Sequence, residues 1–191
     1  NNPSFEQWGD ITKCDTNLAP DSWENYTIWG IAPDEANLDI CPSTIPSYTT
    51  DGHTYVRCFA TSGGSEGMYQ VVYGFTPGEK YHIAFNYAGS NLYGGTGDIQ
   101  WLLFFDDMVV DQTPVYSSMV NEWRGHNYNF IATKTNIKIG FRIELKTLKI
   151  GSGGIDNIVL DQFTGIEEYF ITLPKKDFIK YNLLGQEIPI R

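Results

Sequence analysis

The side chains best suited to bind a small molecule lie on two segments in which apolar and polar residues alternate. In the segments 80–88 and 137–145 every second residue is a large apolar one, which is the period of a strand with one buried face. The polar residues between them point away from the core, and we expect them to share one outer sheet face. Planar polar groups of this kind can form paired hydrogen bonds with sugar hydroxyls. The candidates are His82, Asn86, Arg142 and Glu144.

A sugar site also needs an aromatic ring that stacks against the sugar. The segment 99–105 is apolar on both faces, so either Trp101 or its apolar neighbours must leave the core or be covered by a loop. Trp101 is therefore the first candidate for the stacking ring. The alternative is that Trp101 packs beneath the loop 89–97 and that the charged residues form a solvated face. Tyr93 is the second candidate, because a glycine-rich loop can present a ring at the rim of a site. Trp123 is expected to be structural.

From residue 53 onward the sequence predicts strands separated by turns. Pro77 and Gly78 occupy turn positions, Asp106 and Asp107 are expected to form a second turn, and the glycine run 151–154 a third. No segment has a helical stripe of useful length. The pattern predicts an all-β protein, an antiparallel β-sandwich of the jelly-roll kind, with a short C-terminal extension. The predicted strands are 53–60, 67–75, 80–88, 99–105, 128–132, 137–145 and 155–160.

The first fifty residues are less regular. Two segments, 4–8 and 23–31, could form strands, and 32–50 is expected to be a long loop, which is usually functional or cross-linked. Cys14 and Cys41 lie in this polar, loop-rich part, where a disulfide would restrain the loop in an oxidising compartment. The sequence does not fix this pairing, and both the bonded and the unbonded state stay open. Cys58 lies on the apolar face of a predicted strand and is expected to be a buried free thiol.

Composition excludes several functions. Hydrophobic residues make up 41% of the 191 residues, enough for a core, and the net charge is −10. That charge argues against nucleic acid and against anionic membranes as partners. No apolar run is long enough to span a bilayer, and no signal peptide stands at Asn1, so an exported protein would be present in its mature form. The common hydrolase and phosphate-binding motifs are absent. Asp106 and Asp107 are adjacent, so they cannot form a glycosidase pair on a strand.

Four short motifs occur in a recognisable order: Asn2-Pro3-Ser4-Phe5-Glu6, Pro20-Asp21-Ser22-Trp23, Pro77-Gly78-Glu79-Lys80-Tyr81 and Gly154-Ile155-Asp156-Asn157-Ile158-Val159-Leu160. Together they resemble the galactose-binding-like jelly roll of carbohydrate-binding modules attached to bacterial glycoside hydrolases. The resemblance covers residues 1–163, while the region 90–124 departs from the pattern. It implies a non-catalytic module that binds a polysaccharide or another glycan.

The resemblance also implies a structural calcium ion. In the related modules an acidic residue on the first strand and one on the last strand meet around Ca²⁺, which prefers six to eight oxygen ligands. Glu6 and Asp156 occupy these positions, and Asp51 could supply a further ligand from a neighbouring loop. The alternative is that Asp156 caps a turn or accepts backbone amide hydrogen bonds.

The segment Tyr181-Asn182-Leu183-Leu184-Gly185-Gln186-Glu187 resembles the core of the type IX secretion sorting domain of Bacteroidetes. The sequence changes character after Leu160, which predicts a boundary near Phe163 and a linker over 164–172, and the motif predicts the start of a sorting domain over 173–191. The secretion machinery would then be a partner, and the protein would be secreted or held at the cell surface. The chain stops at Arg191, where that family continues, so we expect a truncated or cleaved sorting domain.

Three functions stay open at this point. The first is a carbohydrate-binding module with a structural calcium. The second is a structural or adhesive surface protein that uses the same sandwich for protein contacts. The third, for which the sequence offers the least support, is a jelly-roll glycoside hydrolase. An exposed ring beside polar groups would favour the first, a large apolar patch at a sheet edge the second, and a carboxylate pair in a pocket the third.

Overall fold

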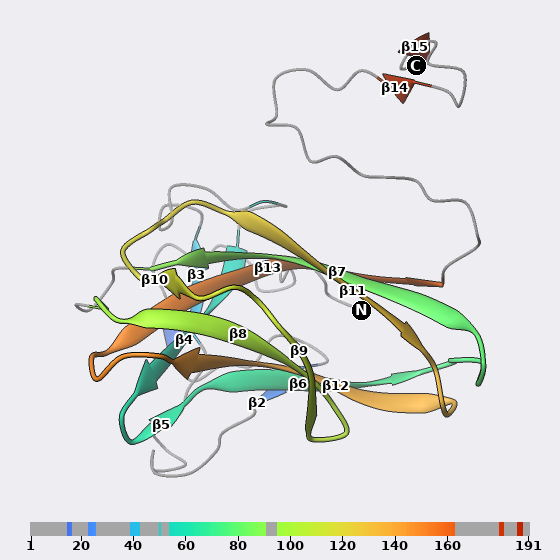
Figure 1. Ribbon diagram of the computed structural model, residues 1–191, viewed down its shortest axis with the longest axis horizontal. Helices are drawn as coiled ribbons and strands as arrows, with labels where there is room; N and C mark the ends of the chain where they lie inside the picture. The colour runs from blue at the N-terminus through green and yellow to red at the C-terminus, as the bar shows by residue number, and fades with distance from the viewer. Residues whose placement is uncertain are drawn as a thin grey trace.

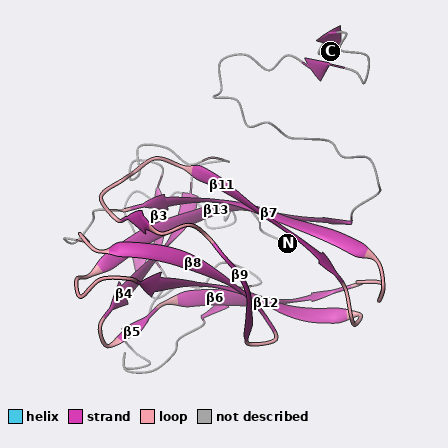
Figure 2. Ribbon diagram, viewed as in Figure 1, coloured by secondary structure: helices cyan, strands magenta, loops and turns pink. Residues whose placement is uncertain are grey.

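The computed structural model describes residues 15–16, 23–25, 39–42, 50, 54–90, 95–162, 180–181 and 187–188. These residues form strands, turns and loops but no helix, and all the strand pairings are antiparallel. Two sheets pack against each other, as Figures 1 and 2 show. The predicted antiparallel β-sandwich is therefore confirmed. The described part of the chain contains no helix long and apolar enough to cross a membrane.

The first sheet, called sheet A, runs in the order β1-β3-β4-β13-β7-β11, with β5 beside β4. The second, called sheet B, runs in the order β10-β8-β12-β6-β2, with β9 beside β8. Sheet A comprises β1 (Asp15–Thr16), β3 (Asp39–Pro42), β4 (Thr54–Thr61), β5 (Gly64–Ser65), β7 (Lys80–Gly89), β11 (Arg124–Ile131) and β13 (Gly151–Gln162). Sheet B comprises β2 (Glu24–Asn25), β6 (Gly67–Tyr73), β8 (Asp98–Phe105), β9 (Met108–Gln112), β10 (Tyr116–Ser117) and β12 (Asn136–Leu145). A separate pair joins β14 (Lys180–Tyr181) to β15 (Glu187–Ile188).

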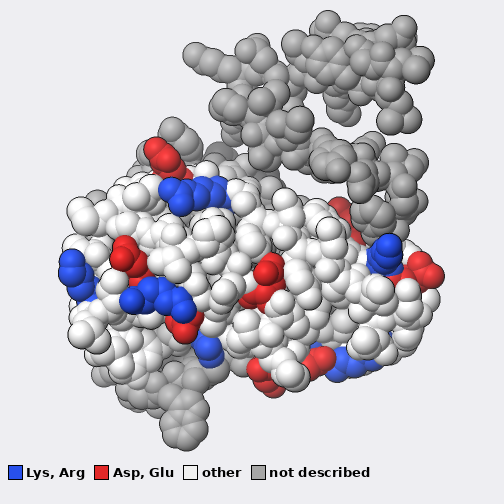
Figure 3. Space-filling view, in the orientation of Figure 1, with Lys and Arg blue, Asp and Glu red and all other residues white. Residues whose placement is uncertain are grey.

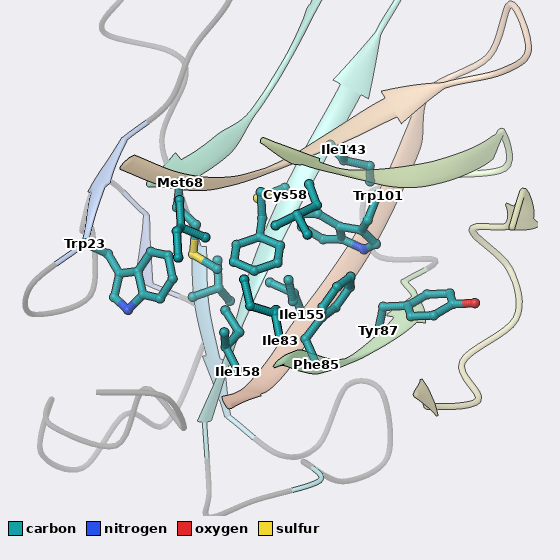
Figure 4. Close-up of a cluster of buried hydrophobic side chains, with 14 of the residues drawn as sticks. Trp23, Cys58, Met68, Ile83, Phe85, Tyr87, Trp101, Ile143, Ile155 and Ile158 are labelled. Atoms are coloured by element: carbon teal, nitrogen blue, oxygen red, sulfur yellow. The ribbon is translucent and has the colours of Figure 1, made fainter. Parts of the chain in front are cut away.

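The core consists of the inward-facing side chains of both sheets. Trp101 and Ile143 from sheet B meet Ile83, Phe85 and further apolar residues of sheet A, as Figure 4 shows. Cys58 is fully buried in the same cluster and is a free thiol, as expected. All seven predicted strands from residue 53 onward are present, because their alternation follows this burial.

Strand β13 differs from the prediction. The glycine run 151–154, expected as a turn, forms the first four residues of this strand and is buried. The reason is packing. A Cβ atom at Gly153 would lie 2.8 Å from the hydroxyl of Tyr116, and one at Gly154 would lie 2.9 Å from the ring of Tyr55. Real Cβ contacts essentially never come closer than 3.0 Å. The glycines let side chains pack directly on the strand backbone.

Strand β9 was not predicted, although the turn before it was. Its sequence, MVVDQ, is short and has no clean alternation. Asp106 and Asp107 form the turn with φ angles of 49° and 69°, a left-handed conformation that costs energy in residues other than glycine. Ion pairs support it: Asp106 lies 2.7 Å from Lys134, and Asp107 lies 2.7 Å from Lys138.

Replacing Trp101 with alanine should lower the free energy of unfolding by about 3–5 kcal/mol, because truncating a buried tryptophan removes contacts and leaves a cavity. Urea denaturation followed by circular dichroism measures the change. Met119→Ala is the control, since that side chain is 60% exposed and its loss should change stability by less than about 0.5 kcal/mol. A Trp101→Ala protein as stable as the wild type would contradict the core position.

Candidate functional site

The predicted polar residues lie on two opposite faces of the sandwich, so the expectation of one shared face is wrong. His82 and Asn86 lie on β7, where they face outward from sheet A. Arg142 and Glu144 lie on β12, where they face outward from sheet B. Alternation fixes which residues of a strand point outward, and the strands happen to belong to different sheets.

The prediction that Trp101 is a stacking ring is also wrong. Its side chain is fully buried within the core between the sheets, as Figure 4 shows. Leu102 and Phe104 point the other way and are buried as well. The guanidinium of Arg142 lies 4.6 Å from the centroid of the Phe104 ring and covers it. Strand β8 is thus enclosed on both faces, which accounts for its largely apolar sequence.

A row of polar side chains crosses the outer face of sheet B from β9 over β8 to β12. The Gln100 Nε2 group donates to Gln112 Oε1 at 3.0 Å and to Glu144 Oε2 at 2.8 Å. Lys146 Nζ lies 2.6 Å from the same Glu144 oxygen. Gln100 is only 3% exposed, whereas Gln112 lies at the surface. We call Gln112, Gln100, Glu144 and Lys146 the polar row.

Beside the polar row, two rings flank a glycine. Gly140 lies between Tyr69 of β6 and Phe104 of β8 in the strand register. A Cβ atom at Gly140 would lie 3.4 Å from the Tyr69 Cβ and 3.7 Å from the Phe104 Cβ, so the floor between the rings carries no side chain. Lys138 Nζ lies 4.2 Å from the centroid of the Tyr69 ring. The outer face of sheet B therefore combines rings, cations and planar polar groups.

A hydrogen bond to Glu24 restrains the Tyr69 side chain. The Tyr69 hydroxyl donates a hydrogen bond to the Glu24 carboxylate on β2. This bond, assisted by burial and by the charges of Glu24 and Asp107, raises the pKa of Tyr69 above its usual value. The phenol, which is protonated at neutral pH in any case, therefore keeps donating to higher pH than an ordinary tyrosine.

Charge on the viewed face is mixed. Figure 3 shows basic and acidic side chains close to one another rather than in blocks of one sign. Among the described residues, acidic and basic side chains also form ion pairs, such as Lys134–Asp106, Lys138–Asp107 and Lys146–Glu144. Such a surface fits a neutral ligand better than a polyanion, which needs clustered cations.

Asp156 accepts backbone amide hydrogen bonds, as the alternative interpretation predicts, and this leaves the calcium prediction untested. Its carboxylate is fully buried and accepts hydrogen bonds from the Thr50 N–H at 2.8 Å, the Thr50 hydroxyl at 2.9 Å and the Asn157 N–H at 2.8 Å. The register of β13 shifts between Asp156 and Val159, and Asn157 has a φ of 50°. Asp156 therefore anchors this irregularity to the chain around Thr50.

No group of three or more histidine, cysteine, aspartate or glutamate residues that could hold a metal occurs among the described residues. Two of the predicted ligands, Glu6 and Asp51, lie outside those residues, as do Tyr93 and Cys14. Cys41 lies on β3, in a stretch whose side chains are not described. The calcium site, the disulfide and the role of Tyr93 stay predictions.

Sequence reasoning missed Gln100, Gln112 and Tyr69. A signal for Gln100 was present, because a single amide within the apolar run 99–105 must find hydrogen-bond partners once it is buried. Gln112 lies on the strand that was not predicted. Tyr69 lies on the predicted strand 67–75, whose weak alternation did not show which face it occupies.

Comparison with known proteins identifies solved structures of similar fold. The sequence matches no protein-family model and no curated protein. Among solved structures, the carbohydrate-binding module TmCBM61, determined in complex with β-1,4-galactotriose, aligns with a TM-score of 0.55 at 18% identity, over 85% of this chain and 97% of that one.

Two further structures have similar coverage. The C-terminal family 22 carbohydrate-binding module of Xyn10B from Clostridium thermocellum aligns with a TM-score of 0.52 at 12% identity, over 87% of this chain and 94% of that one. The K1 cleaved adhesin domain of Lys-gingipain from Porphyromonas gingivalis aligns with a TM-score of 0.51 at 11% identity, over 83% and 95%. The chain therefore has the β-sandwich fold of carbohydrate-binding modules.

Proposed function

We propose that the chain is a non-catalytic carbohydrate-binding module whose glycan binds to the outer face of sheet B. The observation that carries this proposal is the polar row beside the Arg142–Phe104 stack. Amide, carboxylate and guanidinium groups lie side by side there on three adjacent strands. Sugar hydroxyls both donate and accept hydrogen bonds, and planar groups can engage two of them at once.

The rigidity of the strands supports the same face. Arg142 and Glu144 both lie on β12, where Arg142 pairs with β6 and with β8 and Glu144 pairs with β8. A site on paired strands is held in one geometry, so little conformational entropy is lost on binding. The similarity to TmCBM61 and to the family 22 module adds fold-level support, and at 18% and 12% identity it extends no further.

A second candidate function is a structural or adhesive surface module that contacts proteins. The observation favouring it is a set of large apolar side chains left at the surface. Met108 and Val109 follow the β8–β9 turn with exposures of 72% and 51%, and Tyr73 is 76% exposed. Exposed apolar residues can contribute to protein contacts when they are contiguous. The similarity to the adhesin domain supports this candidate at the level of the fold only, as the similarity to the carbohydrate-binding modules does for the first candidate.

We also propose a structural calcium ion held by Glu6, Asp156 and Asp51. The resemblance to the related modules motivates it, and the Asp156 carboxylate offers oxygen ligands of the kind that Ca²⁺ prefers. Thr50, which binds Asp156 directly, is the sequence neighbour of Asp51.

Export through the type IX route is proposed from the motif 181–187, with residues 1–163 as the binding domain and 173–191 as the start of the sorting domain. Within the motif segment, Tyr181 pairs with Glu187 in the two-stranded sheet of β14 and β15. Export would bring Cys14 and Cys41 into an oxidising compartment, where we propose that they form a disulfide.

The glycan site is tested with a glycan array followed by calorimetry on Arg142→Ala and Glu144→Ala. Loss of charge-assisted bonds should weaken binding roughly 10- to 100-fold. Asn129→Ala, an exposed change on the opposite face, should bind like the wild type. Urea denaturation of each variant excludes unfolding as the cause. Unchanged affinity in both sheet B variants, or binding to no glycan at all, would refute the proposed site.

The calcium site is tested by thermal melting with EDTA and with added CaCl₂. An ion that binds only the folded chain must stabilise it, so EDTA should lower the melting temperature and calcium should restore it. Glu6→Gln should remove this dependence. Identical melting curves with and without chelator would rule the site out.

The sorting segment is tested by fusing residues 173–191, with whatever follows them in the gene, to a reporter in a Bacteroidetes cell. The reporter should appear outside the cell. As a control, the Tyr181→Ala/Gly185→Ala fusion should be retained. A wild-type fusion that stays in the periplasm would contradict the assignment.

A further inference from the structure

Gln100 is a buried amide on a strand that is otherwise enclosed by apolar groups. Only 3% of its surface is exposed, and its neighbours Ile99 and Trp101 are fully buried. Burying an amide is unfavourable unless its polar atoms are paired. The Gln100 nitrogen has two partners, Gln112 at 3.0 Å and Glu144 at 2.8 Å, both on the outer face of sheet B.

The chemistry of Glu144 fixes the orientation of both amides. An ionised carboxylate only accepts hydrogen bonds, so the Gln100 side chain must turn its NH₂ group toward Glu144. The same nitrogen lies against the side chain of Gln112. Because that nitrogen can only donate, Gln112 must present its oxygen to Gln100. One carboxylate therefore determines the orientation of two glutamines in succession.

This orientation determines which atoms face a ligand. The Gln112 oxygen accepts from Gln100, so the NH₂ group of this exposed residue is left to act as a donor. Gln100 and Lys146 both approach Oε2 of Glu144. Within the described residues, Oε1 of Glu144 has no hydrogen bond and is an available acceptor. The Gln112 and Glu144 side chains both contact one Gln100 nitrogen, so they are close enough to engage neighbouring hydroxyls of one sugar.

We infer that Gln100 is a positioning residue that sets the ligand class of this face as a neutral sugar with adjacent hydroxyls. One hydroxyl accepts a hydrogen bond from Gln112, and its neighbour donates one to Glu144. A sugar with a carboxylate at the second position has no proton to donate and meets the charge of Glu144, so it is rejected. This inference rests on the proposed glycan-binding function.

The network itself is tested without ligand. Unfolding free energies are measured for Gln100→Leu, Gln112→Ala, Glu144→Ala and the two double variants that contain Gln100→Leu. If the hydrogen bonds form as described, the effects in each double variant should be non-additive, because its two residues share one network. Gln162→Leu on β13 is the matched control, an exposed glutamine whose change should be additive with Gln112→Ala. Additive effects in both cycles would overturn the inference.

The ligand class is tested by calorimetry with the best neutral oligosaccharide from the array and with its uronic-acid analogue. Gln100→Leu should weaken binding of the neutral sugar about 10-fold, and should have no further effect once Gln112 and Glu144 are both alanine. The affinity for the neutral sugar divided by the affinity for the acidic sugar should be smaller in Glu144→Gln than in the wild type. Full binding by Gln100→Leu, or an unchanged preference in Glu144→Gln, would overturn the inference alone. A wild-type chain that binds no glycan would overturn the proposed function together with this ligand class.

Discussion

Strand β8 is buried on both faces, and the arrangement of sheet B depends on how each face is covered. On the inside, Trp101 packs into the core, so the strand cannot turn over without exposing the largest buried side chain. On the outside, the guanidinium of Arg142 covers the Phe104 ring, so a charged group packs against the sheet. The same strand carries Gln100 between the two neighbouring strands. Burial of β8 therefore holds the polar row in place.

The strands were predictable because they are long and one of their faces is buried. In β7 and β12 the apolar period of two identifies each outward side chain, and the structure bears this out for Asn86 and Arg142. Which sheet a strand joins is not encoded in its own alternation. That choice depends on long-range pairing with strands distant in the sequence, such as β7 with β13 and β12 with β6. Asn86 and Arg142 were consequently assigned to one face.

Other features lay beyond local sequence rules. The segment of β8 is apolar on both sides, so periodicity could not decide which way Trp101 points. Glycine-rich sequence usually indicates a turn, but in β13 it reflects the close approach of Tyr55 and Tyr116 to the backbone. The partners of Gln100 come from β9 and β12, which are 12 and 44 residues away in the chain. A site made from separate strands becomes visible only when the strands are assembled.

The crowding around Gly153 and Gly154 has an evolutionary consequence. A residue with any side chain at these positions would push Tyr116 or Tyr55 away from the strand, so substitution is restricted by shape and not by ligand. Outward-facing side chains such as those of Glu144 and Lys146 are partly exposed and are under no such steric restriction. Distant relatives with this packing should therefore keep the glycine pair of β13 while their exposed residues diverge. The pair is then a better marker of this packing than the exposed face of sheet B.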